Sequence, residues 1–165
     1  ALFGAEAPRL VVAEGGASRC ESVARGLAHA SPGGTVLIHD GVRPFVTRPL
    51  IDRVLGGLEG AHGSIPALAV TDTLKEAHGE FVVRTVPRAG LYHVQTPQAF
   101  PTDLVRDAHT RAARDGLDVT DDSALMETLG YRVRVVEGDP FNIKITYPSD
   151  MTLAEAILGC RTASA

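Results

Sequence analysis

The sequence has few cysteines, no long apolar run and no excess of positive charge. Its two cysteines, Cys20 and Cys160, lie far apart and lack metal-ligand spacing, so we expect no disulfide framework and a cytoplasmic location. No apolar stretch reaches the roughly 18 residues of a membrane span, and no basic segment precedes one, which argues against a membrane partner. The net charge of -4 gives no general attraction for nucleic acid, so a phosphate-bearing ligand must be held by local cations.

The 165-residue chain opens with Ala-Leu-Phe-Gly rather than Met and reaches an apolar stretch at residues 10–13 almost at once. We expect that a beginning is missing, although ordinary processing would give the same appearance. With 44% hydrophobic residues, a chain of this length is typical of a single domain, which we place over residues 1–165.

Strand patterns and helical patterns alternate along the chain. We predict strands at residues 10–13, 35–39, 64–70, 91–95, 131–136 and 142–146, and helices at residues 18–30, 49–58, 102–114, 121–129 and 149–158. Ser18 and Glu21 form a Ser-x-x-Glu capping box at the start of the first helix. The alternation predicts an α/β fold with a mostly parallel, doubly wound sheet that binds ligands at the carboxyl ends of its strands.

Residues 73–86 interrupt this alternation. Two β-leaning stretches flank His78-Gly79, and the second, at residues 81–86, is too apolar for a solvated loop. We interpret the segment as a projecting β-hairpin arm. A two-stranded ribbon is marginal alone, so the arm is expected to pack on a second subunit and form a homodimer.

Two adjacent glycines, Gly15 and Gly16, precede the first predicted helix. Because they lack a Cβ, a base or phosphate could approach their backbone N–H groups near the positive helix end. A Gly pair before a helix is more often a simple turn, Ser18 could be only a cap, and Ser22 could face either the ligand or solvent.

Asp40 lies where a buried strand gives way to a loop, and open α/β sheets build their sites at such positions. Mg²⁺ prefers hard carboxylate oxygens together with substrate phosphates, which suits a single aspartate. The alternative is that Asp40 only forms a turn or caps a helix. We interpret His39 as a partly buried structural histidine, because no nucleophile near it in sequence pairs with it.

Arg88 and Thr73 lie at the two ends of the predicted arm, which a hairpin would bring together. A fork of Arg donors beside a Thr hydroxyl suits a phosphate monoester, whereas a solvated, charged edge strand would explain the same residues. Lys144 stands in the middle of a predicted strand, with Asn142 and Thr146 on its face. Facing a crevice, Lys144 would neutralise phosphate, and on an edge strand it would prevent aggregation. Polar segments at 95–100 and 120–123 are explained mostly by caps and turns.

A series of short motifs follows a fixed order: Gly15-Gly16-x-x-Arg19-x-x-Ser22-Val23, His39-Asp40-x-x-Arg43-Pro44, Asp72-Thr73-x-Lys75, Arg88, Gln95-Thr96-Pro97-Gln98 and Asn142-Ile143-Lys144-x-Thr146. The ordered set resembles the methylerythritol-phosphate cytidylyltransferases nearly from end to end. The resemblance implies a Rossmann-like homodimer that makes CDP-methylerythritol and pyrophosphate from CTP and 2-C-methyl-D-erythritol 4-phosphate with Mg²⁺, for non-mevalonate isoprenoid biosynthesis. Charge neutralisation and positioning would drive this reaction, without a covalent enzyme intermediate.

The resemblance also implies residue roles. Lys144 and Arg88 would be catalytic, and Asp40 would lie near the metal and the triphosphate. The nucleotide-binding residues would be Gly15, Gly16, Arg19, Ser22, Asp40 and Gly41, and the substrate-binding residues Thr73, Arg88, Thr96 and Lys144. Thr73 and Arg88 would act in the partner's active site.

The family begins with a glycine-rich loop containing an Arg and, further on, a Pro-Lys-Gln segment, which bind the triphosphate. Neither has a counterpart in this sequence, so we expect roughly 50 to 70 residues, about one or two βαβ units, to be absent ahead of Ala1. These 165 residues alone should then be nearly inactive. Two alternatives stay open: a ribitol 5-phosphate cytidylyltransferase, which shares several motifs, and a noncatalytic nucleotide-binding or dimerisation module. The motif at residues 72–75 and the residues after Arg88 favour the methylerythritol enzyme.

Overall fold

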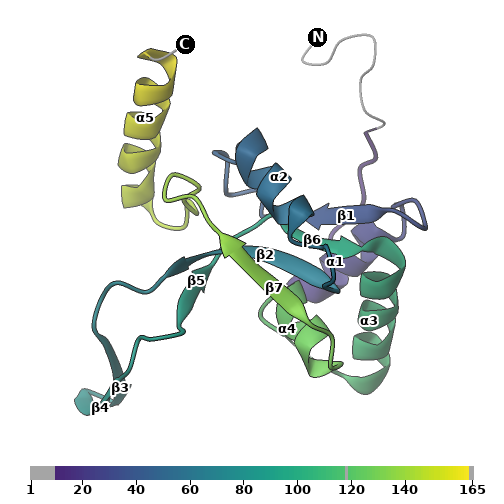
Figure 1. Ribbon diagram of the computed structural model, residues 1–165, viewed down its shortest axis with the longest axis horizontal. Coiled ribbons are helices and arrows are strands. Elements are labelled where there is room, and N and C mark those ends of the chain that lie inside the picture. The colour runs from purple at the N-terminus through teal and green to yellow at the C-terminus, as the bar shows by residue number, and fades with distance from the viewer. Residues whose placement is uncertain (1–9, 118, 164–165) are drawn as a thin grey trace.

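The computed structural model describes residues 10–117 and 119–163, which form an α/β fold with one five-stranded sheet and a separate two-stranded hairpin (Figure 1). The elements in chain order are α1 (Arg19–Leu27), β1 (Thr35–Ile38), α2 (Arg48–Gly56), β2 (Gly63–Ala69), β3 (Leu74–His78), β4 (Phe81–Val86), β5 (Tyr92–Val94), β6 (Gln98–Pro101), α3 (Thr102–Asp115), α4 (Asp122–Thr128), β7 (Val133–Glu137) and α5 (Pro148–Ala163). The predicted α/β class is confirmed. No helix in the described ranges is long and apolar enough to cross a membrane.

The sheet is built around β2, which pairs in parallel with β7 and antiparallel with β5 and β6. Ser64 pairs with Ala99 and Ala67 with Val94, so β6 and β5 lie along one side of β2 in a nearly continuous register. β1 is antiparallel to β6 and therefore runs in the direction of β2 and β7. Three strands thus share one direction, as in a mostly parallel sheet. The reversed β6 separates β1 from β2, so β2 and β7 are the one parallel-bonded pair within the described residues.

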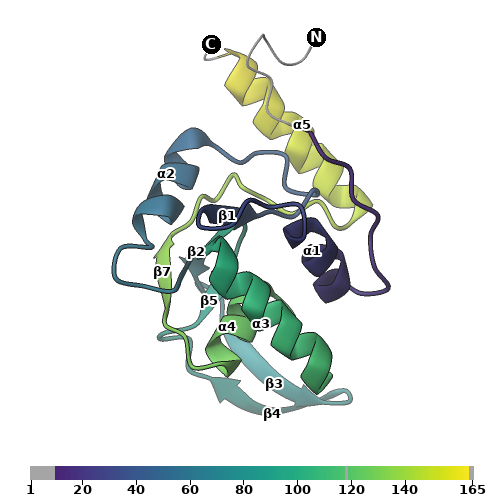
Figure 2. The ribbon, with the colours of Figure 1, turned by 90° about the vertical axis from the view of Figure 1, so that its right-hand side faces the viewer.

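Helices cover both faces of the sheet (Figure 2). On one face, Phe100 of β6 packs with residues of α1, α3 and α4, including Leu27, Val105 and Leu125. On the other face, the neighbouring Ala99 packs with α2. Adjacent strand residues point to opposite faces, so this single strand serves both layers.

Side chains fix the helix starts as the sequence indicates. The Ser18 hydroxyl accepts a hydrogen bond from the Glu21 backbone N–H at α1, and the Asp121 carboxylate accepts one from the Ala124 N–H at α4. The Asp150 carboxylate accepts hydrogen bonds from the backbone N–H groups of Thr146 and Tyr147, which fixes the chain as it enters α5. The segments that lead into α1 and α4 are therefore held by contacts within a few residues of each helix start.

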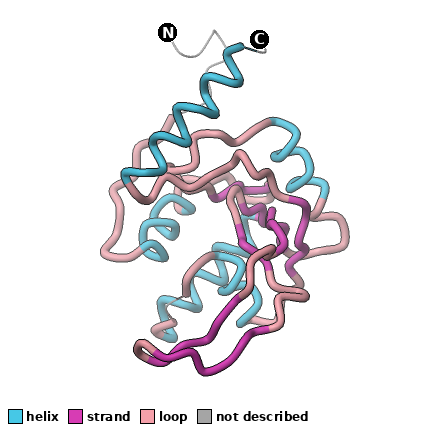
Figure 3. Tube along the Cα trace, turned by 90° about the vertical axis from the view of Figure 1, so that its left-hand side faces the viewer, coloured by secondary structure: helices cyan, strands magenta, loops and turns pink. Residues whose placement is uncertain are grey.

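The predicted arm is a β-hairpin. β3 and β4 pair antiparallel, with an irregularity between Glu76 and Ala77, and extend away from the sheet (Figure 3). The apolar side chains of Phe81, Val82 and Val83 are exposed, with Phe81 at 79% of its full area. The hairpin is confirmed, and its packing on a second subunit stays a prediction.

Three strand assignments need correction. Residues 10–13 form no strand and are exposed, because no strand lies beside them in the described part of the chain. Residues 142–146 keep the predicted alternation, with Ile143 and Ile145 packed toward α5, but pair with no strand in the described ranges. The segment explained by caps and turns contains β6 in the sheet interior, where buried Gln98 donates to the Asp121 carboxylate and accepts from the Ser123 N–H. A satisfied amide can occupy a buried strand, which composition alone does not reveal.

Candidate active site

Asp40, just after the end of β1, is surrounded by three cationic side chains. Its carboxylate oxygens lie 3.3 Å from Lys144 Nζ, 3.6 Å from Arg43 Nε and 3.9 Å from Arg19 Nε. Arg19 begins α1, Arg43 belongs to the loop after β1, and Lys144 comes from the segment that follows β7. Arg19 also pairs with Asp122, so the group holds three positive and two negative charges, and its small local excess of positive charge suits a polyanionic ligand.

The Asp40 backbone is held by Thr96 and His39. The Asp40 N–H donates to Thr96 Oγ1 at 3.0 Å, and Thr96 Oγ1 lies 2.9 Å from His39 Nδ1. His39 Nε2 lies 2.9 Å from the Arg43 carbonyl oxygen, which can only accept, so Nε2 carries a proton. Nδ1 of the neutral ring then accepts from the Thr96 hydroxyl. His39 therefore links the two ends of the Asp40 loop, which is a structural role, but it is exposed and not partly buried as predicted.

A buried amide network fixes the segment that carries Lys144. Gln95 brackets the backbone of Asp139, donating from Nε2 to its carbonyl at 2.9 Å and accepting its N–H at 3.0 Å. The Asn142 side chain, which is fully buried, donates to the Thr96 carbonyl at 2.7 Å, and the Asn142 carbonyl accepts from Arg43 Nη1 at 2.9 Å. Lys144 thus extends from a backbone tied to the Asp40 loop.

Arg19 has a second acidic partner on α4. Its Nη2 lies 2.8 Å from Asp122 Oδ2, and Asp122 Oδ1 lies 2.9 Å from Nε2 of His109. Burial alone would raise the pKa of Asp122, but the His109 hydrogen bond and the positive charge of Arg19 outweigh it and hold the pKa below its usual value. Asp122 therefore stays ionised and orients Arg19.

Arg43 is the most enclosed of the three cations. Burial lowers its pKa, while the charge of Asp40 acts in the opposite direction. An arginine stays charged at neutral pH even after such a shift. Its buried Nε has no hydrogen-bond partner in the described part of the protein and faces Asp40 at 3.6 Å. Arg43 also lines the cleft, so its positive charge acts on an anion bound there.

These residues line an open, polar cleft of about 670 Å³. The lining residues are Arg19, Asp40, Arg43, Tyr92, His93, Val94, Gln95, Thr96, Gln98, Thr120, Asp121, Ser123, Ala124, Glu127 and Lys144. The volume is within the range of nucleotide and cofactor sites. The Thr96 hydroxyl is occupied by His39 and by the Asp40 N–H, so it holds the loop, and the three cations equip the cleft to bind and neutralise phosphate groups.

A model of the family described as "IspD: 2-C-methyl-D-erythritol 4-phosphate cytidylyltransferase" matches residues 2–160. This chain belongs to that family. A relative of that name from Halalkalibacterium halodurans is 48% identical over 147 residues, which cover 89% of this chain and 64% of the relative. Another, from Thermus thermophilus, is 48% identical over 157 residues, 93% of this chain and 73% of the relative. The chain thus spans 64% to 73% of the length of these two proteins.

Solved structures give the same result. The crystal structure of the Thermus thermophilus cytidylyltransferase superposes with a TM-score of 0.85 at 48% identity, covering 94% of this chain and 78% of that one. The Francisella tularensis enzyme gives a TM-score of 0.84 at 27% identity, covering 94% of this chain and 75% of its own. The names of both proteins specify 2-C-methyl-D-erythritol 4-phosphate as the substrate of those proteins.

Four of the site residues expected for a cytidylyltransferase meet at the cleft: Arg19, Asp40, Thr96 and Lys144. Gly41 follows directly and is exposed, and a Cβ there would have open space around it.

Gly15, Gly16 and Ser22 do not line the cleft. The Ser22 hydroxyl accepts from the Gly16 N–H and donates to the Ser18 carbonyl, so it shapes the loop over α1. A Cβ on Gly16 would overlap the Glu21 side chain, so local packing alone explains why a glycine occupies this position. Their nucleotide contacts stay predictions.

Thr73 and Arg88 lie at the base of the arm, are exposed and do not line the cleft. Arg88 Nη1 donates to the Thr71 carbonyl, which holds its guanidinium against its own chain. A single subunit does not bring either residue to Asp40, so their action in a partner's site stays a prediction.

Sequence reasoning did not assign roles to Arg43, Gln95 or Asp122. Arg43 lies in the motif that contains Asp40, and Gln95 lies in the motif that contains Thr96. These positions next to expected site residues were the sequence signal that could have identified them. Asp122 was interpreted as a cap or turn residue, whereas the cap of α4 is Asp121 and Asp122 pairs with distant Arg19 and His109. No local sequence pattern indicates such a pairing.

Proposed function

We propose that this chain acts in a cytidylyltransferase that transfers CMP from CTP to 2-C-methyl-D-erythritol 4-phosphate. An oxygen of the acceptor phosphate attacks the α-phosphorus of CTP, the bond from that phosphorus to the bridging oxygen breaks, and pyrophosphate leaves. The product is CDP-methylerythritol, an intermediate of non-mevalonate isoprenoid biosynthesis. We place the reaction in the cytoplasm, as the scarcity of cysteine suggests.

The cation-ringed Asp40 cleft is the observation that supports this proposal. The reaction brings an anionic phosphate against an anionic triphosphate, so the protein must neutralise charge and hold the two in line. Arg19, Arg43 and Lys144 supply that charge from three separate segments. Lys144 is half-exposed and lines the cleft, so its ammonium can move from Asp40 to the transferring phosphate.

Asp40 would hold a divalent cation. In the described ranges no group of three or more His, Cys, Asp or Glu side chains could bind a metal by itself. Mg²⁺ needs no such cage, because it usually keeps several waters and takes one or two carboxylates together with substrate phosphates. A single carboxylate in an open cleft fits that donor set, and a bound Mg²⁺ would neutralise the triphosphate. Asp40 would then orient the metal-bound nucleotide while Arg19 binds its phosphates.

The arm would complete the active site of a second subunit. Phe81, Val82 and Val83 expose apolar area on a thin hairpin that buries little of its own surface, which suits burial against another copy of this chain. Thr73 and Arg88 at its base would bind the acceptor phosphate across that interface. This arrangement explains why neither residue lies at the cleft of its own subunit.

A turnover assay on the protein that contains this chain tests the proposal, because the chain spans 64% to 73% of the length of two relatives. Pyrophosphate release is measured with CTP, Mg²⁺ and either 2-C-methyl-D-erythritol 4-phosphate or ribitol 5-phosphate. We expect kcat/KM to be at least about 100-fold higher for the methylerythritol substrate. Equal turnover, or none with either acceptor, would refute the assigned substrate.

A further inference from the structure

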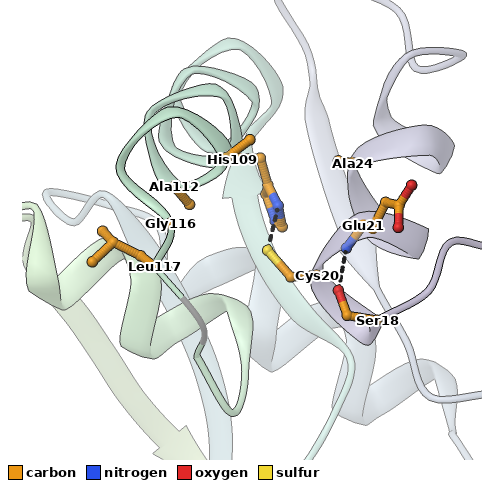
Figure 4. Close-up of a pocket in the computed structure, with 9 residues that line it drawn as sticks. Ser18, Cys20, Glu21, Ala24, His109, Ala112, Gly116 and Leu117 are labelled. Carbon is orange, nitrogen blue, oxygen red and sulfur yellow. Dashed lines mark hydrogen bonds between the residues drawn. The ribbon is translucent and has the colours of Figure 1, made fainter.

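A second cluster of reactive side chains lies between α1 and α3, outside the cleft. Cys20 Sγ lies 3.4 Å from Nδ1 of His109 (Figure 4). The other ring nitrogen of His109 lies 2.9 Å from Asp122 Oδ1. Cys20 is on α1 and His109 on α3, and the two helices pack together. The thiol therefore stands beside a base that a third group orients, an arrangement that activates nucleophilic cysteines.

The hydrogen-bond partners fix the direction of proton transfer. The ionised Asp122 carboxylate is 1% exposed and can only accept, so Nε2 of His109 carries a proton. Nδ1 of the neutral ring then faces the thiol as an acceptor. When the thiol proton moves to Nδ1, the resulting imidazolium is paired with Asp122 on its other side. The nucleophilic thiolate is thus formed next to a stabilised cation.

The cluster opens on its own cavity of about 270 Å³. Besides Cys20 and His109, its walls include the small or apolar side chains of Ala24, Ala112 and Leu117. None of its lining residues lines the Asp40 cleft. A cavity of this size and character admits a compact, mainly apolar molecule to the sulfur.

We propose that Cys20 is a covalent modification site for compact α,β-unsaturated carbonyl compounds. Cys20 Sγ attacks the β-carbon of the alkene, the sulfur–carbon bond forms, and the π electrons move to the carbonyl to give an enolate. The thiol proton passes to Nδ1 of His109 and then to the α-carbon, which regenerates the neutral imidazole. The net reaction is an addition that needs neither an oxidant nor a leaving group.

Alkylation of the full 165-residue chain by N-ethylmaleimide at about pH 6.5, followed by peptide mass spectrometry, tests the site without CTP. The result is therefore independent of the proposed function. Cys160, which is exposed at the end of α5, is the internal reference. We expect Cys20 to react about tenfold faster than Cys160, since Nδ1 of His109 lies 3.4 Å from its sulfur and can accept the thiol proton. A Cys20 rate equal to or below that of Cys160 would overturn the proposal.

Matched histidine variants isolate the role of the imidazole. His109→Gln should remove the advantage of Cys20, and His29→Gln, at an exposed histidine near the end of α1, should keep it. Asp122 is a poorer choice because it also contacts Arg19 of the cleft. A His109→Gln chain that labels as fast as the wild type would also overturn the proposal.

The pH dependence of the unaltered chain decides the question if His109→Gln does not fold. The charged groups around the pair are Asp122 on α4, Arg19 and Glu21 on α1, and Arg106 on α3. Between about pH 8 and 6.5 an ordinary thiol with a pKa near 8.5 should slow about 20-fold. We expect Cys20 to slow less than about fivefold. Parallel slowing of both cysteines would contradict an assisted thiol.

Discussion

Lys144→Ala removes the ammonium that lies 3.3 Å from Asp40 Oδ2. Ile143 and Ile145 pack toward α5 while Lys144 lines the cleft, so the substitution leaves the apolar side of the segment in place. At this distance the attraction of two unit charges is about 1 kcal/mol in bulk water and about 5 kcal/mol at an effective dielectric constant of about 20. The Lys144 side chain is 49% exposed, so the weaker value applies to the ligand-free protein.

The effects on stability and on catalysis should therefore separate. A partly exposed ion pair contributes about 0 to 1 kcal/mol to folding, so the free energy of unfolding should change by less than about 1 kcal/mol. When substrates exclude water, the same ammonium meets charge on the transferring phosphate. Loss of one such transition-state contact typically costs about 3 to 4 kcal/mol, so kcat should fall by about two to three orders of magnitude.

Steady-state kinetics and a thermal melt on the full-length Lys144→Ala protein measure the two effects. Arg48→Ala is the control, because Arg48 is exposed, pairs with Asp52 on α2 and lies outside the cleft. The control should retain wild-type kcat. Wild-type kcat in Lys144→Ala would refute the catalytic assignment and leave Lys144 as a solvated surface cation.

Three further predictions concern Asp40 at the site, Arg88 at the expected dimer interface and the buried carboxylate of Asp122. Asp40→Asn should lower kcat at saturating Mg²⁺ far more than it lowers the melting temperature, and unchanged turnover would rule out Asp40 as the metal residue. If Arg88 acts across the interface, exchanging subunits of inactive Arg88→Ala and Lys144→Ala proteins should restore up to about a quarter of wild-type activity, because half the dimers regain one of two sites. A monomer by ultracentrifugation would contradict this prediction. The pKa of Asp122 is lowered in the fold, so its stabilising contribution is present above the unfolded pKa of about 3.9 and is lost as pH falls through the folded value. Asp122→Asn should therefore flatten the loss of stability below about pH 5 in urea titrations, and an unchanged acid profile would contradict the assignment.

Much of the fold is encoded in local patterns. Helical spacing and caps locate α1, α3 and α4 to within a few residues, and Phe81 to Val86 forms the second arm strand as its apolar pattern predicts. Local patterns fail where pairing decides the outcome. Residues 10–13 have strand composition but no neighbouring strand in the described ranges. Gln98 enters the sheet because the Asp121 carboxylate and the Ser123 backbone N–H, both distant in sequence, satisfy its amide.

The site was predictable to the extent that its residues stand in motifs. Asp40, Thr96 and Lys144 come from three separate motifs, and the structure brings all three to one cleft. The pairing of Asp122 with Arg19 joins residues far apart in the chain, and no periodicity or spacing indicates it. Such a pair depends on how α1 packs relative to α4, which is a property of the tertiary fold.

A crystal structure of the full-length protein with CTP and Mg²⁺ tests the central claim most directly, namely that the cation-ringed cleft at Asp40 holds the nucleotide. We predict that the triphosphate lies within contact of Arg19 and Lys144, with Mg²⁺ between the phosphates and the Asp40 carboxylate. A nucleotide bound elsewhere, with the contacts of Asp40 to Arg19, Arg43 and Lys144 undisturbed, would contradict the account.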